Sequence, residues 1–393
     1  MYPRIFLCAL LVAPLAAACS GGADSSSTGA GGAPAEPWPI DPKTGLRIPS
    51  LGPVPPLPEW ADNPATDAKK ELGKLLFSDP RLSGSGKTVC GNCHFPPNEF
   101  QSGGPKDAPD RSYPKVDPTL PRNTPSLLNI VYAPIMRWDG SYFTNLDDMG
   151  VLPLAEANMD IANTLPAEQV EVVDVPAAQK ALHDKLTAEI PGYIPLFQGA
   201  FGQDIAKLPP EGLWKLAGQA ISVYFRVMVS RDAAFDRWNA GDDNAMGADA
   251  IRGLTLFRGR ARCIDCHSGP FFTDFQFHNI ATSPPGADGK RADEGRYLVT
   301  KQEKDRGAFL TPTMRSAAMT SPYLHDGSEV SISRVIARKT SPETLALDPN
   351  HDPVLDAAPA LTDAEVTDIV AFIKALRGAP LPAADLAPPQ KLP

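Results

Sequence analysis

Two short stretches carry most of the structural information in this chain: CGNCH at residues 90–94 and CIDCH at residues 263–267. Each places two thiols three residues apart, with a histidine directly after the second thiol. This spacing suits covalent attachment of haem c, in which the thiols add to the two vinyl groups along one porphyrin edge. The adjacent histidine then offers its imidazole to the iron. The predicted anchors are Cys90, Cys93, Cys263 and Cys266, and the predicted iron ligands are His94 and His267.

Two other chemistries use closely spaced cysteines. A zinc site needs further Cys or His ligands nearby, and the six histidines of the chain supply no obvious set. A thioredoxin-like redox pair has no need of a histidine after the second cysteine, and still less of two such histidines. The two remaining cysteines, Cys8 and Cys19, lie close to the N-terminus. The distribution therefore excludes a disulfide-rich secreted domain and favours haem attachment.

Composition limits the class of protein further. A chain of 393 residues, 42% of them hydrophobic, has material for about two domains on a prior of ~150 residues each. Its 43 prolines and 31 glycines stay below the roughly 25–30% share typical of a disordered chain. The formal net charge is −9 and no basic run is present, which argues against nucleic acid as a partner.

The first nineteen residues, MYPRIFLCALLVAPLAAAC, have the pattern of an export signal. Arg4 precedes an apolar run that is shorter than the ~20 residues of a transmembrane helix. Small residues before Cys19 are similar to a bacterial lipoprotein signal, in which that cysteine becomes the lipidated N-terminus. Leu15 departs from the commonest pattern by one place, so plain cleavage stays open. We expect a periplasmic or cell-envelope protein that touches the membrane only through a lipid at Cys19.

The rest of the chain divides by composition and by a crude duplication. A helix leading into a close cysteine pair occurs twice, with LGKLLF at residues 72–77 and LTLF at residues 254–257. This duplication predicts two related domains, and Gly-, Ser- and Pro-rich sequence predicts a flexible or extended linker before them. The expected boundaries are 1–19 for the signal, 20–58 for the linker, 59–242 and 243–380 for the two haem domains, and 381–393 for a tail.

Hydrophobic residues recur at helical spacing in several segments. The predicted helices cover residues 65–77, 211–238 and 246–260, and a last one follows Thr362. Thr362 and Glu365 form a capping-box pattern at its start, and Gly378 is the expected stop. No convincing strand alternation is present. The expected fold is mostly α, with long irregular loops.

Longer stretches around the two motifs resemble the bacterial di-haem cytochrome c peroxidases and their MauG-like relatives. They are LGKLLFSDPRLSGSGKTVCGNCH, PRNTPSLLNIVY, RWDG, ARCIDCHSGPFFTDFQFHN and TPTMRSAAMTSPYLHDGS. The resemblance covers about residues 60–380 and implies a cytochrome-c-like fold in each half. It also implies that the N-terminal haem is peroxidatic, whereas the C-terminal haem stores or relays electrons.

The resemblance assigns four further residues. Trp138, in RWDG, falls where the family has a tryptophan between the haems; simple aromatic packing is its alternative role. Asn123 matches a position whose side chain binds an inter-domain calcium ion. Thr320 and Pro322 match positions that offer backbone carbonyls to this ion, and oxygen ligands suit Ca²⁺. The expected cofactors are two covalently bound haem c groups and one Ca²⁺.

The chain departs from the family at the sixth ligand of the C-terminal haem. Family members carry Met or Tyr about a dozen residues after an HDG triplet, which here ends at Gly327, and twelve places further is Lys339. Two interpretations stay open: a solvated surface lysine, or a neutral amine bound to iron. The second requires loss of a proton from a group whose usual pKa is about 10.4.

A second departure lies at the N-terminal haem. No histidine follows His94 closely enough to be an evident sixth ligand, so we expect an open iron ready for peroxide. The distal glutamate of the family aligns with Met159. Peroxide cleavage needs a carboxylate that moves a proton between the two oxygens, so Asp160 or Glu156 is expected to serve if the loop is shifted. If neither serves, activity is poor, and Met159 is free to cap the iron.

Two functions follow from these expectations. The first is a di-haem oxidoreductase that reduces hydrogen peroxide at the N-terminal haem, with electrons arriving through the C-terminal haem from a small periplasmic redox protein. A MauG-like variant of it oxidises a partner protein at a distance. The alternative is a non-catalytic di-haem electron-transfer protein, which the missing glutamate keeps open.

Overall fold

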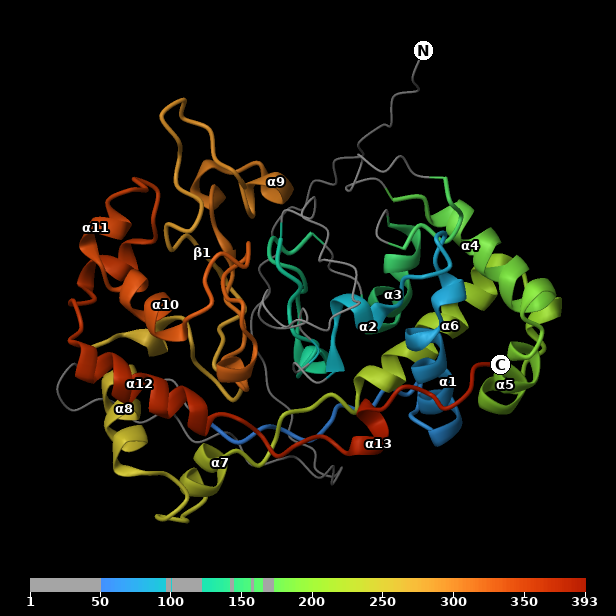
Figure 1. The fold of residues 1–393 in the computed structure, drawn as a ribbon, viewed down its shortest axis with the longest axis horizontal. Coiled ribbons are helices and arrows are strands. Elements are labelled where there is room, and N and C mark those ends of the chain that lie inside the picture. The colour runs from blue at the N-terminus through green and yellow to red at the C-terminus, as the bar shows by residue number, and fades with distance from the viewer. Residues whose placement is uncertain (1–50, 97–99, 101–121, 142–144, 157–158, 165–172) are drawn as a thin grey trace, which may run out of the picture. The chain divides into compact units, whose positions relative to one another are not determined.

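The computed structural model describes residues 51–96, 100, 122–141, 145–156, 159–164 and 173–393. Within these ranges no helix is long and apolar enough to cross a membrane. The predicted signal at residues 1–19, Cys19 and most of the predicted linker at 20–58 lie outside the described residues. The described chain is mostly helical with irregular connections, which confirms the predicted fold class (Figure 1).

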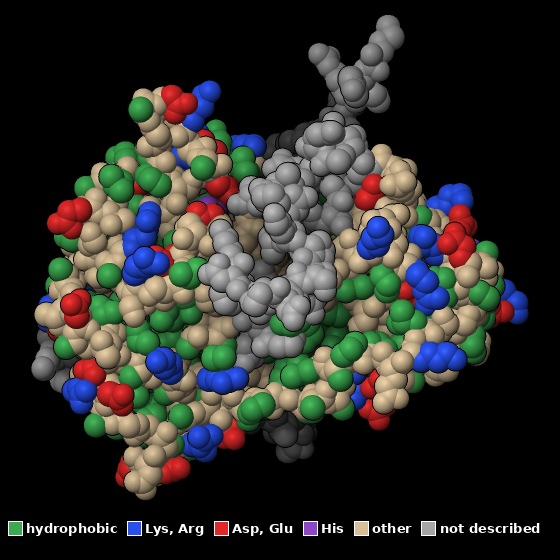
Figure 2. All heavy atoms as spheres, in the orientation of Figure 1, with side chains coloured by type: hydrophobic (Ala, Val, Ile, Leu, Met, Phe, Trp, Pro, Cys, Tyr) green, Lys and Arg blue, Asp and Glu red, His purple; other side chains and the backbone are tan. Residues whose placement is uncertain are grey.

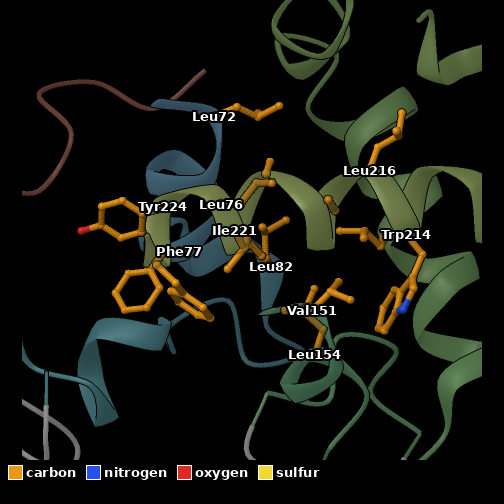
Figure 3. Close-up of a cluster of buried hydrophobic side chains, with 14 of the residues drawn as sticks. Leu72, Leu76, Phe77, Leu82, Val151, Leu154, Trp214, Leu216, Ile221 and Tyr224 are labelled. Carbon is orange, nitrogen blue, oxygen red and sulfur yellow. The ribbon is translucent and has the colours of Figure 1, made fainter. Parts of the chain in front are cut away.

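A first set of helices, the N-terminal helical group, is built around α6. Helices α1, α3 and α4 all contact α6, and α5 packs on α1. In Figure 3, Leu76 of α1 lies beside Ile221 of α6, and Leu72 of α1 belongs to the same buried core. Burial of these apolar faces provides the main stabilisation of the group. The helices are α1 (Asp67–Ser78), α3 (Leu146–Val151), α4 (Val175–Asp184), α5 (Tyr193–Phe201) and α6 (Pro210–Phe225).

The second set, the C-terminal helical group, is built around α12. This helix contacts α7, α8 and α10, and its buried face includes Ile369 and Phe372. The predicted capping box is confirmed, since Thr362 Oγ1 accepts from the Glu365 amide and the Glu365 carboxylate accepts from the Thr362 amide. The helices are α7 (Ala234–Asn239), α8 (Ala248–Arg258), α10 (Ile332–Lys339), α11 (Pro342–Leu345) and α12 (Asp363–Ala375).

Short elements complete the described chain. Three are one-turn helices: α2 (Cys90–Cys93), α9 (Tyr297–Thr300) and α13 (Ala383–Leu386). Two strands of two residues each, β1 (Phe277–His278) and β2 (Phe309–Leu310), pair antiparallel. The sequence showed no alternation there, because so short a ladder needs none.

The helix predicted over residues 211–238 is wrong in its middle. The structure ends α6 at Phe225 and begins α7 at Ala234. Between them the backbone binds other segments: the Ser230 amide donates to Asn129 Oδ1 at 3.1 Å, and the Met228 carbonyl accepts from the Asn129 amide at 2.8 Å. Tertiary hydrogen bonds thus replace the helical ones that the local pattern favoured.

In both helical groups, two helices cross closely at a glycine, with a pair of aromatic rings four residues further along. A Cβ added at Gly73 of α1 would lie 2.0 Å from the Ala220 carbonyl oxygen of α6. A Cβ added at Gly253 of α8 would lie 1.9 Å from the Asp368 oxygen of α12. Glycine is therefore required for each close crossing. Four residues after each glycine, an aromatic ring meets a ring of the partner helix, at 5.4 Å for Phe77–Tyr224 and 5.1 Å for Phe257–Phe372.

This repeated pair supports the duplication inferred from the sequence, while the boundaries 59–242 and 243–380 stay predictions. The segment called a tail, 381–393, returns to the N-terminal helical group (Figure 1). There the Tyr224 hydroxyl donates to the Asp385 carbonyl at 2.8 Å, and Lys70 forms an ion pair with the Asp385 carboxylate at 3.5 Å. Its proline-rich composition indicated no such docking.

Candidate functional site

The first CxxCH centre follows α1 in the N-terminal helical group. Cys90 and Cys93 bound the single turn of α2, and His94 directly follows it. His94 Nδ1 lies 3.0 Å from the Phe100 carbonyl oxygen. A carbonyl only accepts, so Nδ1 carries the proton and the Nε2 lone pair is left for a metal. Burial lowers the pKa of His94 to about 4, which keeps the imidazole neutral.

The second centre has the same geometry. Cys263 opens a 3₁₀ turn over Cys263–Asp265 that ends at Cys266. His267 Nδ1 lies 3.0 Å from the Phe272 carbonyl oxygen, so Nδ1 carries the proton and the Nε2 lone pair is again left for a metal. Burial and then the charge of Lys339 lower the pKa of His267 to about 3.

The four motif cysteines are free thiols in the described chain. Burial raises the pKa of Cys90 and of Cys263 to about 12. Reactive redox cysteines have a lowered pKa, so these surroundings disfavour a redox pair. The residues present fit a covalently attached haem at each centre: two thiols, then one neutral imidazole with a fixed Nδ1–H.

A cavity adjoins the second centre. Cys263, Cys266 and His267 line it together with mostly apolar residues and with Lys339 of α10. Lys339 Nζ lies 3.4 Å from His267 Nε2, and burial lowers the pKa of Lys339. The structure therefore places Lys339 on the wall of the cavity, close to His267.

Trp138 lies on the wall of this cavity and also on the wall of a second one. Its indole N–H donates to the Asn123 carbonyl at 2.8 Å, and its own carbonyl accepts from the Leu310 amide at 2.8 Å. The second cavity is also lined by Pro125, whose carbonyl interacts with the His94 imidazole. Trp138 therefore lines both the cavity of the His267 centre and the cavity that includes Pro125, a contact of His94.

The structure separates the two candidate distal carboxylates. Glu156 is buried and forms an ion pair with Arg137, a residue that lines the second cavity beside Trp138. Asp160 instead accepts from the Thr164 amide at 3.1 Å within its own loop. Met159, which aligns with the family glutamate, is buried in the N-terminal core. Of these residues, Glu156 has the clearest link to the cavity.

The three residues expected at calcium lie together. Asn123, Thr320 and Pro322 all line the second cavity. The Asn123 side-chain amide donates to the Pro322 carbonyl at 2.7 Å and to the Leu324 carbonyl at 3.3 Å. Two backbone carbonyl oxygens therefore converge on the Asn123 side-chain amide.

Near the second centre, His278 is held by hydrogen bonds, as expected for a histidine in this segment, and its carboxylate partners are seen only in the structure. His278 donates from Nε2 to Asp274 at 2.9 Å and from Nδ1 to Asp352 at 2.5 Å. Burial alone would lower its pKa, but hydrogen bonds to Asp274, Cys266 and Asp352 raise the pKa of His278 to about 11. Cys266, Asp274 and His278 offer ligand atoms within 4.8 Å of one another. Because Cys266 belongs to the CxxCH motif, we interpret the group as a charged neighbour of that centre. In the sequence, the DxxxH spacing indicates that the side chains of Asp274 and His278 can meet. Asp352 is too distant along the chain for any such signal.

A mostly helical fold with two CxxCH centres is typical of di-haem c-type redox proteins. Comparison with known proteins identifies the family within this class. A family model described as di-haem cytochrome c peroxidase matches residues 67–244. Cytochrome-c peroxidase IdrP1 of Denitromonas iodatirespirans is 34% identical over 358 residues, which cover 84% of this chain and 87% of the relative. Methylamine utilization protein MauG of Methylorubrum extorquens is 35% identical over 326 residues, 82% of each protein.

A solved structure of a MauG-like protein associated with microbial copper homeostasis has the same fold, with a TM-score of 0.68 and 24% identity over 86% of this chain and 97% of that chain. This chain belongs to the di-haem cytochrome c peroxidase and MauG family. The resemblance drawn from the sequence is confirmed. Membership makes the protein a peroxidase-type oxidoreductase with two c-type haems.

Proposed function

We propose that this protein reduces hydrogen peroxide at the His94 centre with electrons that arrive through the His267 centre. The overall change is H₂O₂ + 2 e⁻ + 2 H⁺ → 2 H₂O. The observation that carries the proposal is Trp138, which lines both the cavity of the His267 centre and a second cavity that includes Pro125, whose carbonyl contacts His94. When bound, the haems supply the redox-active iron. The protein's own residues attach them, orient the ligands and move protons.

Cys90, Cys93, Cys263 and Cys266 are the proposed attachment points, with one porphyrin edge at each pair. The carbonyls of Phe100 and Phe272 hold His94 and His267 as neutral Nε2 donors. A hydrogen bond on the far ring nitrogen also raises the basicity of a histidine ligand.

Glu156 is the proposed proton carrier for peroxide, because its salt-bridge partner Arg137 lines the second cavity. A carboxylate that accepts a proton from one peroxide oxygen and delivers it to the other lowers the barrier to O–O cleavage. Asp160 is less suited, because its described contact is local to its loop.

The test is optical and EPR spectroscopy before and after one equivalent of peroxide, on wild type, His94→Ala and a control, His183→Ala. His183 lies in α4 and its ring contacts the Leu208 carbonyl at 3.0 Å, away from both motifs. We expect one high-spin centre that reacts with peroxide in wild type and in His183→Ala but not in His94→Ala. Two low-spin haems inert to peroxide would overturn the proposal and favour the electron-carrier alternative.

Calcium binding at Asn123, Thr320 and Pro322 is a second part of the proposal, supported by the convergence of carbonyl oxygens on Asn123. An Asn123 amide turned to present Oδ1 would join these carbonyls as a ligand set. Treatment with EGTA is expected to lower the melting temperature of wild type, with less effect on Asn123→Ala. Equal responses of the two proteins would count against this site.

The electron source is proposed to be a small periplasmic redox protein, or a protein substrate that is oxidised at a distance, as the kinship with MauG suggests. Figure 2 shows Lys and Arg interspersed with Asp and Glu on the visible face, so charge there favours no one type of partner.

We also propose export and lipid attachment at Cys19. Radiolabelled palmitate should enter wild type and not Cys19→Ser; equal labelling would contradict the anchor.

A further inference from the structure

Lys339 is the last residue of α10, and its amine enters the cavity beside the second centre. Lys339 Nζ lies 3.4 Å from His267 Nε2, and Cys263 and Cys266 line the same cavity. Helix α10 packs on α12, with Ile336 buried one turn before the lysine. The helix therefore holds the amine on the side of the cavity that faces the imidazole.

The polar surroundings of this amine differ from those of other lysines. Lys70, Lys180 and Lys207 each form an ion pair with an aspartate, and the buried amines of Lys69 and Lys74 donate to carbonyl oxygens. In the described part of the chain, the polar atom recorded within hydrogen-bonding distance of Lys339 Nζ is a bare imidazole nitrogen. A buried ammonium without a carboxylate is costly. The site is built for a nitrogen base and not for an ion pair.

The hydrogen bonding of His267 also indicates that Lys339 faces a nitrogen lone pair. Its Nδ1 proton is committed to the Phe272 carbonyl, so Nε2 presents a lone pair toward Lys339. A neutral amine presents a lone pair as well. Two facing nitrogen bases are both satisfied by one metal ion between them, and two metal–nitrogen bonds of about 2.0–2.1 Å would place the nitrogens about 4 Å apart. The separation of 3.4 Å needs only a small widening.

We propose that Lys339 is the sixth ligand of the C-terminal haem iron, opposite His267, so that this centre is six-coordinate and closed to peroxide. Lys339, having passed its proton to solvent as a neutral amine, would donate its lone pair to the iron in one Fe–N bond. An amine is a harder donor than a thioether and favours the ferric state, which lowers the reduction potential. The inference rests on the proposed haem attachment and gives the second centre an electron-transfer role.

The experiment compares wild type with Lys339→Ala, Lys339→Met and the control Lys374→Ala, whose exposed lysine lies on α12. Intact mass first shows whether each protein carries two haems. EPR and near-infrared magnetic circular dichroism then report the ligands of each ferric haem, with 10 mM imidazole added in a second set. Redox titration gives the potential of the second centre.

We expect Lys339→Ala to lose the low-spin signal of the second centre, or to change its ligand-field bands, and to bind added imidazole there. Lys339→Met should restore a low-spin centre with a higher potential, and Lys374→Ala should match wild type. Unchanged second-centre spectra in Lys339→Ala with two haems attached would overturn the proposal. Wild-type protein that shows the amine ligand but fails to react with peroxide would overturn only the proposed function. A wild-type haem count below two would overturn the proposed covalent attachment of haem at the two CxxCH motifs.

Discussion

At the residue scale, each histidine proposed to bind iron depends on one phenylalanine carbonyl. Phe100 and Phe272 are fully buried and adopt φ of 57° and 54°, a left-handed conformation that is uncommon for such side chains. In this conformation their carbonyls reach His94 Nδ1 and His267 Nδ1. The histidines were evident from the motif, but the carbonyls depend on backbone angles that one sequence does not display.

The proposed role of Glu156 in moving protons for peroxide can be tested at a single side chain. Glu156→Gln removes the proton acceptor and its charge pairing with Arg137, so we expect peroxide turnover to fall by about 10²–10⁴-fold with two haems still attached. Asp160→Asn is the matched control and should retain activity within a few fold. Steady-state kinetics with a reduced redox protein measures both. Loss in Asp160→Asn alone would show that the loop presents Asp160 instead.

His278 predicts a pH dependence of stability. Its pKa is raised in the folded protein to about 11, so its stabilising contribution is complete below the usual histidine pKa of about 6.5 and declines as pH rises toward 11. The difference in unfolding free energy between wild type and His278→Gln should therefore be largest near pH 6 and shrink by pH 10. Urea unfolding at pH 6, 8 and 10 measures it; a difference that grows with pH would refute the charged imidazole.

At the element scale, each centre follows a helix that crosses its partner through a glycine. The crossings of α1 with α6 and of α8 with α12 leave no room for a Cβ. The sequence pattern located these helices and their apolar faces. It did not identify which helix each would meet, because the partner segments lie over a hundred residues further along the chain. It also joined α6 to α7, since the Asn129 contacts that separate them are tertiary.

Gly253→Ala tests the crossing. The new methyl group would lie 1.9 Å from the Asp368 oxygen, so α8 and α12 must move apart, and we expect a loss of about 1–3 kcal/mol in unfolding free energy. Gly199→Ala is the control, because this glycine lies within α5 with nothing within 4 Å of the added Cβ. Its helix propensity should rise instead. Equal stability of the two variants in chemical unfolding would argue against a tight crossing.

At the scale of the whole molecule, ion pairs and hydrogen bonds join the halves that carry the two motifs. Arg122 forms ion pairs with Asp139 and, in the other half, with Asp293, and the Asn123 side chain donates to the Pro322 carbonyl. Trp138 lies among these links, with its indole N–H on the Asn123 carbonyl. This network places an aromatic ring where both cavities meet.

Trp138→Phe keeps an aromatic ring but removes the indole. If Trp138 carries electrons between the centres, the variant should transfer them more slowly after peroxide, while the resting spectra of both haems stay unchanged. Stopped-flow absorbance measures the rate, and Trp238→Phe, at a site that packs on Phe235, is the control. An unaltered rate in Trp138→Phe would leave aromatic packing as the role of this residue.

The sequence by itself determined the chemistry: two CxxCH motifs, their histidines, a mostly helical chain and the family. Those features are local, because the spacing of thiols and imidazole along the chain is what haem attachment requires. Only the tertiary structure decided which distant groups face the motifs. It placed Lys339 opposite His267, linked Glu156 to Arg137 and drew residues 381–393 onto the first helices. These contacts join segments far apart in sequence, and their partners are chosen by packing and by burial of charge.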